Sequence, residues 1–236
     1  MHMLRREFLL RSGIVPLLVS HRLGWSSFFV DGADRRTLEC KWQSRKSKYL
    51  CDLSATNQGP FDFTQLFVNG KLQTRSRFPN CDPAQAPGPY ARAVRGIPAG
   101  ASSPDPLVET YQGPPGVGIV GIEFDPETFS TRRWAKPEEA IVSLYPTPTS
   151  QPLLRRILTL DYDRNLIWFD YRDAGKTTSS YADVISIDQN SRFFVENVYE
   201  EMDAPGEWYL SRQSNSLYYR PAAELDMNTA VFEIPR

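Results

Sequence analysis

Short strand-like runs separated by turn residues limit the fold of this chain more than any other feature of its sequence. From about residue 25 onward, brief runs mix apolar alternation with β-branched or aromatic residues, and many of the 19 Pro and 14 Gly lie between them. Runs this short are typical of strands rather than of amphipathic helices. Eight or more strands with one or two short helices predict a mainly β protein, built as an antiparallel barrel or a sandwich.

Two hairpins are predicted from their turns. Asn69-Gly70 separates two short apolar runs, and both residues tolerate the positive φ that a two-residue turn requires. The segment RILTLDYDRNLIWFDYR (156–172) consists of two strand-like runs joined at Asp163 to Asn165. The first hairpin pairs residues 65–68 with 71–75, and residues 207–221 are interpreted as a further hairpin. The remaining runs that we interpret as strands cover residues 28–30, 38–42, 48–53, 117–124 and 141–145.

Two short helices and one long loop complete the expected organisation. Pro137, followed by two Glu, is typical of a helix start, because Pro suits the first turn and acidic residues suit the helix dipole. Phe194, Val198 and Met202 recur every four residues, which indicates the apolar face of a second short helix. Residues 79–116 are dense in Pro, Gly, Ala and Ser and predict a long irregular loop.

Composition excludes several kinds of chemistry. The 27 basic and 28 acidic residues leave a formal charge of −1, without the basic character of a nucleic-acid-binding protein. No apolar run is long enough to cross a bilayer. Both histidines, His2 and His21, lie near the start, so the rest of the chain offers no His-based triad or zinc site. We expect no cofactor and no metal, and any chemistry would rest on carboxylates, Tyr, Lys or Cys.

The three cysteines allow two interpretations. Cys40 and Cys51 flank a segment that could form a hairpin with facing ends, so they could form a disulfide in an oxidising compartment. Separate thiols, with Cys81 as the third, are the simpler interpretation and the one slightly favoured.

The N-terminus also leaves two interpretations open. Arg5-Arg6 followed by Phe8-Leu9 resembles a twin-arginine export signal, which would make residues 1–24 a leader and the protein exported. Alternatively, these residues form a short amphipathic helix before a domain boundary, with its apolar face at Leu9, Leu10, Ile14 and Leu17.

The stretch SRFFVENVYEEMDAPGEWYLSRQSNSLYYRP (191–221) concentrates acidic and aromatic residues. Structural roles are the favoured interpretation, since ion networks and sheet packing are common uses of these side chains. The acids could instead be paired glycosidase carboxylates, whose separation in space the sequence does not fix; the candidates are Glu200, Asp203 and Glu207. The aromatic rings could stack on sugars; the candidates are Trp134, Trp208, Tyr209 and Tyr218.

Two stretches resemble signatures of bacterial right-handed parallel β-helix proteins. LFVNGKLQTRSRFPN (66–80) is similar to LFVNGKRQ…ARYPN, and the 191–221 stretch is similar to RFYVENVLEELDAPGEWYLD…LYYWP. The resemblance is to the group around glycoside hydrolase family 141, which acts on plant or algal polysaccharides and carries these signatures in a β-rich insertion domain. It covers about residues 35–221. Phe78 and Ser211 depart from the signatures, which usually have Tyr and Asp there.

The resemblance implies a β-rich insertion-type domain at 25–221 and a tail at 222–236 that leads toward a β-helix. The family's catalytic carboxylates belong to coils expected beyond the LYYRP hairpin, so none can be carried over to this sequence. We therefore expect a non-catalytic accessory domain, a truncated or stand-alone copy, that shapes a substrate cleft. The alternatives are a stand-alone carbohydrate-binding module and a small carboxylate-dependent glycosidase. In each case the expected partner is a polysaccharide or oligosaccharide.

Overall fold

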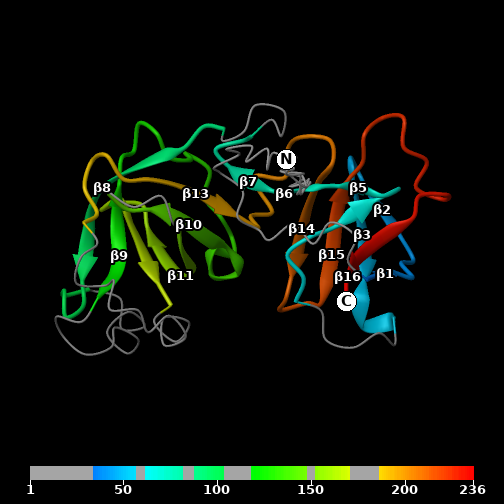
Figure 1. Cartoon of the computed structure of the whole chain (residues 1–236), viewed down its shortest axis with the longest axis horizontal. Helices are drawn as coiled ribbons and strands as arrows, with labels where there is room; N and C mark the ends of the chain where they lie inside the picture. Colours follow the sequence, from blue (N-terminus) through cyan, green and yellow to red (C-terminus); the bar gives the residue numbers. More distant parts are fainter. Residues whose placement is uncertain (1–33, 57–61, 82–87, 104–117, 148–151, 171–185) are drawn as a thin grey trace, which may run out of the picture.

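Two β-rich lobes lie side by side in the computed structural model (Figure 1). The structure describes residues 34–56, 62–81, 88–103, 118–147, 152–170 and 186–236. The middle of the chain forms the barrel lobe, and the two ends of the described chain meet in the sandwich lobe. The predicted mainly β fold is confirmed, and the described helical segments are single 3-10 turns at Leu53–Ala55 and Pro137–Glu139.

Six strands close the barrel lobe. Each pairs antiparallel with its neighbours in the order β10-β11-β12-β9-β8-β13, and β13 pairs back with β10 to complete the ring. A short seventh strand, β7, adds to β13. The closed ring leaves few unpaired strand edges. The strands are β7 (Arg77–Phe78), β8 (Ala91–Pro98), β9 (Ile119–Phe124), β10 (Ile141–Tyr145), β11 (Leu153–Asp161), β12 (Leu166–Phe169) and β13 (Arg192–Glu196).

Aromatic rings fill much of the barrel interior. The Phe129 ring lies 4.3 Å from that of Phe124 and 5.2 Å from that of Trp134, measured between centroids. The strands also approach closely where β9 meets β12. A Cβ added at Gly121 would lie 2.5 Å from the Ile167 carbonyl oxygen, so only glycine fits this approach without a shift of the backbone.

Two sheets pack face to face in the sandwich lobe. One has the order β2-β3-β15-β14-β6 and the other β1-β16-β4-β5, and only β14 and β6 run parallel. Trp208, Tyr219 and Phe232 are buried between the sheets. The strands are β1 (Arg35–Thr37), β2 (Gln43–Arg45), β3 (Lys48–Asp52), β4 (Phe67–Val68), β5 (Lys71–Leu72), β6 (Thr74–Arg75), β14 (Glu207–Ser211), β15 (Ser216–Arg220) and β16 (Phe232–Pro235).

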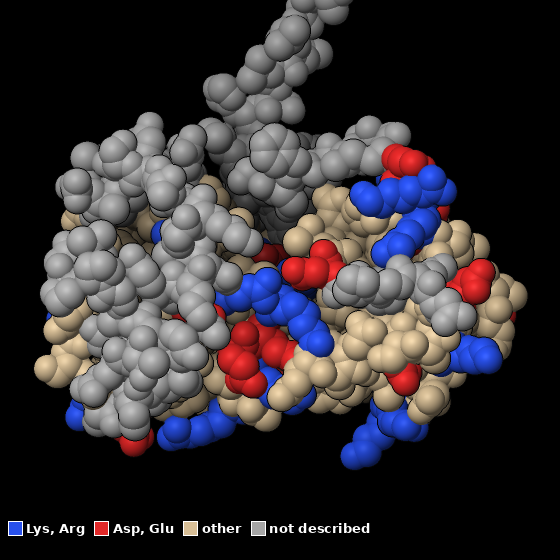
Figure 2. All heavy atoms as spheres, turned by 90° about the horizontal axis from the view of Figure 1, so that it is seen from below, with Lys and Arg blue, Asp and Glu red and all other residues tan. Residues whose placement is uncertain are grey.

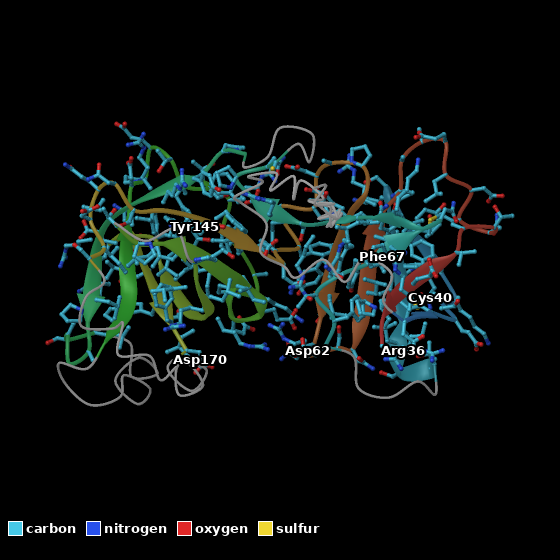
Figure 3. The ribbon with its side chains drawn as sticks, viewed as in Figure 1. Arg36, Cys40, Asp62, Phe67, Tyr145 and Asp170 are labelled. Atoms are coloured by element: carbon cyan, nitrogen blue, oxygen red, sulfur yellow. A yellow bond between two sulfur atoms is a disulfide. The ribbon has the colours of Figure 1, made fainter. Side chains whose placement is uncertain are left out.

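A disulfide joins Cys40 to Cys51 in the sandwich lobe, with the two Cα atoms 5.5 Å apart. Figure 3 shows Cys40 in this lobe. The favoured interpretation of three separate thiols was therefore wrong for this pair, because the β2–β3 hairpin brings the two residues together. Cys81 takes part in no disulfide among the described residues.

The predictions that rest on local turn chemistry are confirmed. Asn69 and Gly70 have φ of 49° and 76° and join β4 to β5, and β11 pairs with β12 across the predicted second turn. The strands expected at 48–53, 117–124 and 141–145 correspond to β3, β9 and β10. The run at 28–30 lies outside the described residues. The run at 38–42 is not a strand but connects β1 to β2.

The helix predicted from Phe194, Val198 and Met202 was wrong. Phe194 belongs to β13, which is hydrogen-bonded to β10 on one side and to β8 and β7 on the other. Pairing on both sides made Phe194 part of the sheet, whereas Val198 and Met202 lie beyond the end of β13 at Glu196.

The prediction of a long irregular loop at 79–116 was also wrong in part. Strand β8, from Ala91 to Pro98, runs through its middle and pairs with β9. The final strand, β16, lies within the tail at 222–236 and pairs with β1 and β4.

Candidate functional site

The segment from 197 to 206 leads from the barrel lobe to the sandwich lobe, and Asn197 fastens the two together. Its buried side chain donates to the carbonyls of Glu139 and Leu210, at 2.9 Å each, and accepts from the Leu210 amide at 2.9 Å. A looser ion-pair contact lies at Asp62, whose carboxylate is 3.6 Å from Arg156 and 3.9 Å from Arg212 (Figure 3). These contacts set the position of one lobe against the other.

A pocket of about 170 Å³ opens where the lobes meet. The barrel lobe contributes the loop before the Pro137–Glu139 turn, and the sandwich lobe contributes β14, β15 and the turn between them. The connecting segment contributes the third wall. The lining residues are Ala135, Lys136, Tyr199, Glu200, Tyr209, Ser211, Ser214 and Tyr218.

Three tyrosine rings form one side of the pocket. Tyr209 and Tyr218 are register partners across β14 and β15, and alternation along each strand turns them away from the core that holds Trp208. The Tyr199 ring lies 5.6 Å from the Tyr209 ring and 5.1 Å from the Tyr218 ring. Lys48 lies 4.1 Å from the centre of the Tyr199 ring and donates to its carbonyl. The rings are thus held as one cluster.

A buried carboxylate supports this tyrosine cluster from behind. Glu139 accepts hydrogen bonds from the Tyr209 hydroxyl, from Ser211 Oγ at 2.9 Å and from the Gln213 amide at 3.0 Å. Burial, together with the hydrogen bond to Glu139, raises the pKa of Tyr209 well above its ordinary value. The Tyr209 hydroxyl therefore stays protonated and fixed in place.

Two of the three candidate catalytic acids are engaged by the protein itself. Asp203 accepts from Arg132 and from Asn80 Nδ2, both at 2.7 Å. Burial tends to raise the pKa of Asp203, but these hydrogen bonds outweigh it and hold that pKa below its usual value. Glu207 accepts from the amides of Asp203 and Ala204 at 2.7 Å each. Burial outweighs those bonds and raises the pKa of Glu207 to about 7.

Glu200 differs from these two acids because it lines the pocket. One of its oxygens, Oε1, accepts from the Ala135 amide at 3.0 Å, which ties the connecting segment to the barrel lobe. The neighbouring Glu201 is buried instead, where it accepts from Trp134 Nε1 at 2.8 Å and from Ser130 Oγ at 2.5 Å.

The structure separates the four aromatic candidates into two pairs. Tyr209 and Tyr218 line the pocket. Trp134 is in the barrel core and donates to Glu201, while Trp208 has 0% of its surface exposed and stacks against Phe63. Sequence reasoning did not select Tyr199. Its aromatic character was the one available signal.

Across the described ranges, no group of three or more His, Cys, Asp or Glu side chains could hold a metal ion. The helical segments of the same ranges include none that is long and apolar enough to cross a membrane. On the face seen in Figure 2, basic and acidic side chains lie next to each other near the middle of the molecule.

The sequence matches no family model and no curated protein. The fold is similar to that of a solved structure named "Glycoside hydrolase", with a TM-score of 0.55 and 17% sequence identity. The match covers 86% of this chain and 31% of that chain, so this chain corresponds to less than a third of the neighbour's length. The likeness supports a glycoside hydrolase-related fold.

Proposed function

We propose that this chain is a non-catalytic accessory domain of a polysaccharide-active protein, of the insertion-domain type found around glycoside hydrolase family 141. The two signatures at 66–80 and 191–221 support that assignment, and so does the match to one part of a much longer glycoside hydrolase. The partner of the domain would be a right-handed β-helix that carries the reactive carboxylates. The domain itself would form one wall of the substrate cleft.

The observation that carries the proposal is the engagement of the acids near the connecting segment. A glycosidase needs two carboxyl groups that face each other across about 5 to 9.5 Å, with room for a sugar between them. Asp203 is instead paired with Arg132, and Glu207 is buried against two backbone amides. The ion pair of Asp203 and the backbone hydrogen bonds of Glu207 are those of side chains that stabilise a turn.

The test is a hydrolysis assay of the purified chain on xylan, pectin and fucosylated glycans. We expect no new reducing ends above those of a heat-inactivated sample. Robust turnover that disappears in Glu200→Ala, Asp203→Ala or Glu207→Ala would refute the proposal and establish a small carboxylate-dependent glycosidase.

A stand-alone carbohydrate-binding module is the second candidate. It is favoured by the pocket between the lobes, where tyrosine rings lie beside charged and hydroxyl groups. Affinity electrophoresis on soluble glycans tests it. Retarded migration is the expected result, and unchanged mobility on every glycan would count against binding.

Export is part of the proposal. The Cys40–Cys51 disulfide supports it, because such bonds persist in oxidising compartments. The Arg5-Arg6 signal lies outside the described residues. Fusing residues 1–33 to a reporter should direct it to the periplasm, and replacing both arginines with lysine should abolish this. A reporter that stays in the cytoplasm would refute export by this route.

A further inference from the structure

We infer that the pocket between the lobes binds one neutral sugar ring of a glycan. Tyr199 and Tyr218 provide the stacking surface, and Glu200 and Lys136 provide the hydrogen bonds. The inference rests on the proposed function, which makes a glycan the class of ligand. It goes further by naming the site, the size of the ligand and its charge.

The size of the pocket limits the ligand to one ring. At about 170 Å³ the pocket is small. Sites for drug-sized ligands are larger, at about 300 to 1,000 Å³. A stretch of polysaccharide would therefore place one residue in the pocket and run on across the surface.

The tyrosine rings match the apolar face of a pyranose. Tyrosine combines a flat apolar body with a polar tip, which suits a ligand that has C–H groups on one face and hydroxyls around its edge. Tyr199 is 37% exposed and Tyr218 is half-buried, so both rings offer surface to a ligand. Lys48 and Tyr209 hold the Tyr199 ring, which lowers the cost of ordering it on binding.

The polar groups of the pocket match the hydroxyls of a sugar. Glu200 Oε2 receives no hydrogen bond from the described residues, while Oε1 is anchored on the Ala135 amide. The Lys136 ammonium likewise forms no hydrogen bond or ion pair within the described part of the chain. A carboxylate accepts from hydroxyls and an ammonium donates to them, so each can bind the edge of one ring.

The charges of these two groups favour a neutral sugar. Lys136 and Glu200 carry opposite charges and together leave the lining of the pocket without net charge. The carboxylate of a uronic acid would be attracted to Lys136 and repelled by Glu200, so the lining gives it no net electrostatic gain to offset the cost of removing its charge from water. Neutral hexoses and pentoses meet no such penalty.

The experiment measures binding of the chain to soluble neutral glycans, namely xylan, mixed-linkage glucan and galactomannan, and to polygalacturonate, by affinity electrophoresis and calorimetry. The pocket variants are Tyr199→Ala and Glu200→Gln. Their matched controls are Tyr90→Ala, a half-buried tyrosine of the barrel lobe, and Glu138→Gln, an exposed acid next to Glu139 that does not line the pocket. Circular dichroism and thermal unfolding establish that each variant is folded.

We expect at least one neutral glycan to bind and polygalacturonate to bind more weakly. Each pocket variant should lose about tenfold or more in affinity, as expected when a hydrogen bond to a charged group or an aromatic contact is removed. The two controls should stay within about twofold of the parent chain, since surface changes away from a site have small effects.

Three results would overturn the inference. Equal binding by the parent chain and by folded pocket variants would place the ligand elsewhere and leave the proposed accessory role intact. Preferential binding of polygalacturonate would contradict the assignment of a neutral sugar as the ligand. Failure to bind every glycan would eliminate the subsite, whereas the proposed function is decided separately by the hydrolysis assay.

Discussion

The two lobes enclose their hydrophobic cores in different ways. In the barrel lobe, hydrogen bonding between β13 and β10 closes a ring of six strands around packed aromatic rings. In the sandwich lobe, two open sheets are held together by the side chains between them, and the Cys40–Cys51 disulfide ties the segment before β2 to β3. Backbone pairing closes the barrel all the way round, whereas side-chain packing joins the two sheets of the sandwich. The sandwich contributes Tyr209 and Tyr218 to the pocket, and the connecting segment contributes Tyr199.

Removing the central side chain of the sandwich should have the largest effect on stability. Trp208 is fully buried, and Trp208→Ala should lower the free energy of unfolding by about 3 to 5 kcal/mol, as large-to-small core changes do. Urea denaturation followed by circular dichroism measures the loss. Leu154→Ala, at a 57% exposed position of the barrel, is the control and should change it by less than about 0.5 kcal/mol. Equal effects of the two changes would contradict the assignment of the sandwich core.

Removing the disulfide should weaken the sandwich lobe and spare the barrel. The two cysteines are 11 residues apart, and closing a loop of that size contributes about 3 kcal/mol in the chain-entropy model. The double change Cys40→Ser and Cys51→Ser should therefore increase hydrogen exchange in β2 and β3 more than in β9 to β12. Cys81→Ser serves as the control for loss of a thiol. An equal increase in hydrogen exchange in both lobes would show that they unfold as one unit.

The connecting turn should make stability depend on pH through Glu207. Its pKa is raised from 4.5 to about 7 in the folded protein, so the folded state binds a proton more tightly than the unfolded state. The contribution of this group is fully present below pH 4.5 and is lost as the pH rises through about 7, by at most about 3 kcal/mol.

The measurement for Glu207 is the free energy of unfolding between pH 4.5 and 8 for the parent chain and for Glu207→Gln. We expect the difference between the two curves to fall with rising pH across that window. Curves that stay parallel, or that diverge in the opposite direction, would show that burial does not dominate at this carboxyl.

Adding a methyl group where β9 and β12 approach closely should lower stability more than adding one at the turn between β4 and β5. Gly121→Ala places a Cβ 2.5 Å from the Ile167 carbonyl oxygen and should cost about 1 to 3 kcal/mol. Gly70→Ala meets open space and only the strain of a positive φ, which costs about 1 kcal/mol. Thermal unfolding of both variants gives the comparison. A smaller effect at Gly121 would mean that β9 and β12 can separate.

Features that depend on a few consecutive residues could be predicted from the sequence. The Asn69-Gly70 turn and the hairpin of β11 and β12 are of this kind. Strand β8 was missed because its buried residues include the small Ala91 and Ala93, which give little apolar contrast, and because its partner β9 is distant in sequence. The helix predicted at Phe194 failed because β13 pairs on both sides with strands distant in sequence and ends before Val198.

The candidate site was predictable only in part, since the placement of the lobes decides its composition. Tyr209 and Tyr218 belong to one hairpin and were selected from the sequence. Lys136 lies more than sixty residues earlier, and it reaches the same pocket because Asn197 bonds to both lobes. Nothing in the local sequence around Lys136 indicates that contact.

Release of reducing ends from neutral glycans by the purified chain tests the central claim most directly. A chain in which Asp203 and Glu207 serve only its structure should release none, even from a glycan that slows its migration in affinity electrophoresis. Steady release that is abolished by Glu207→Gln in a folded protein would contradict the account, because it would assign catalysis to a carboxyl that we place in the architecture of the turn.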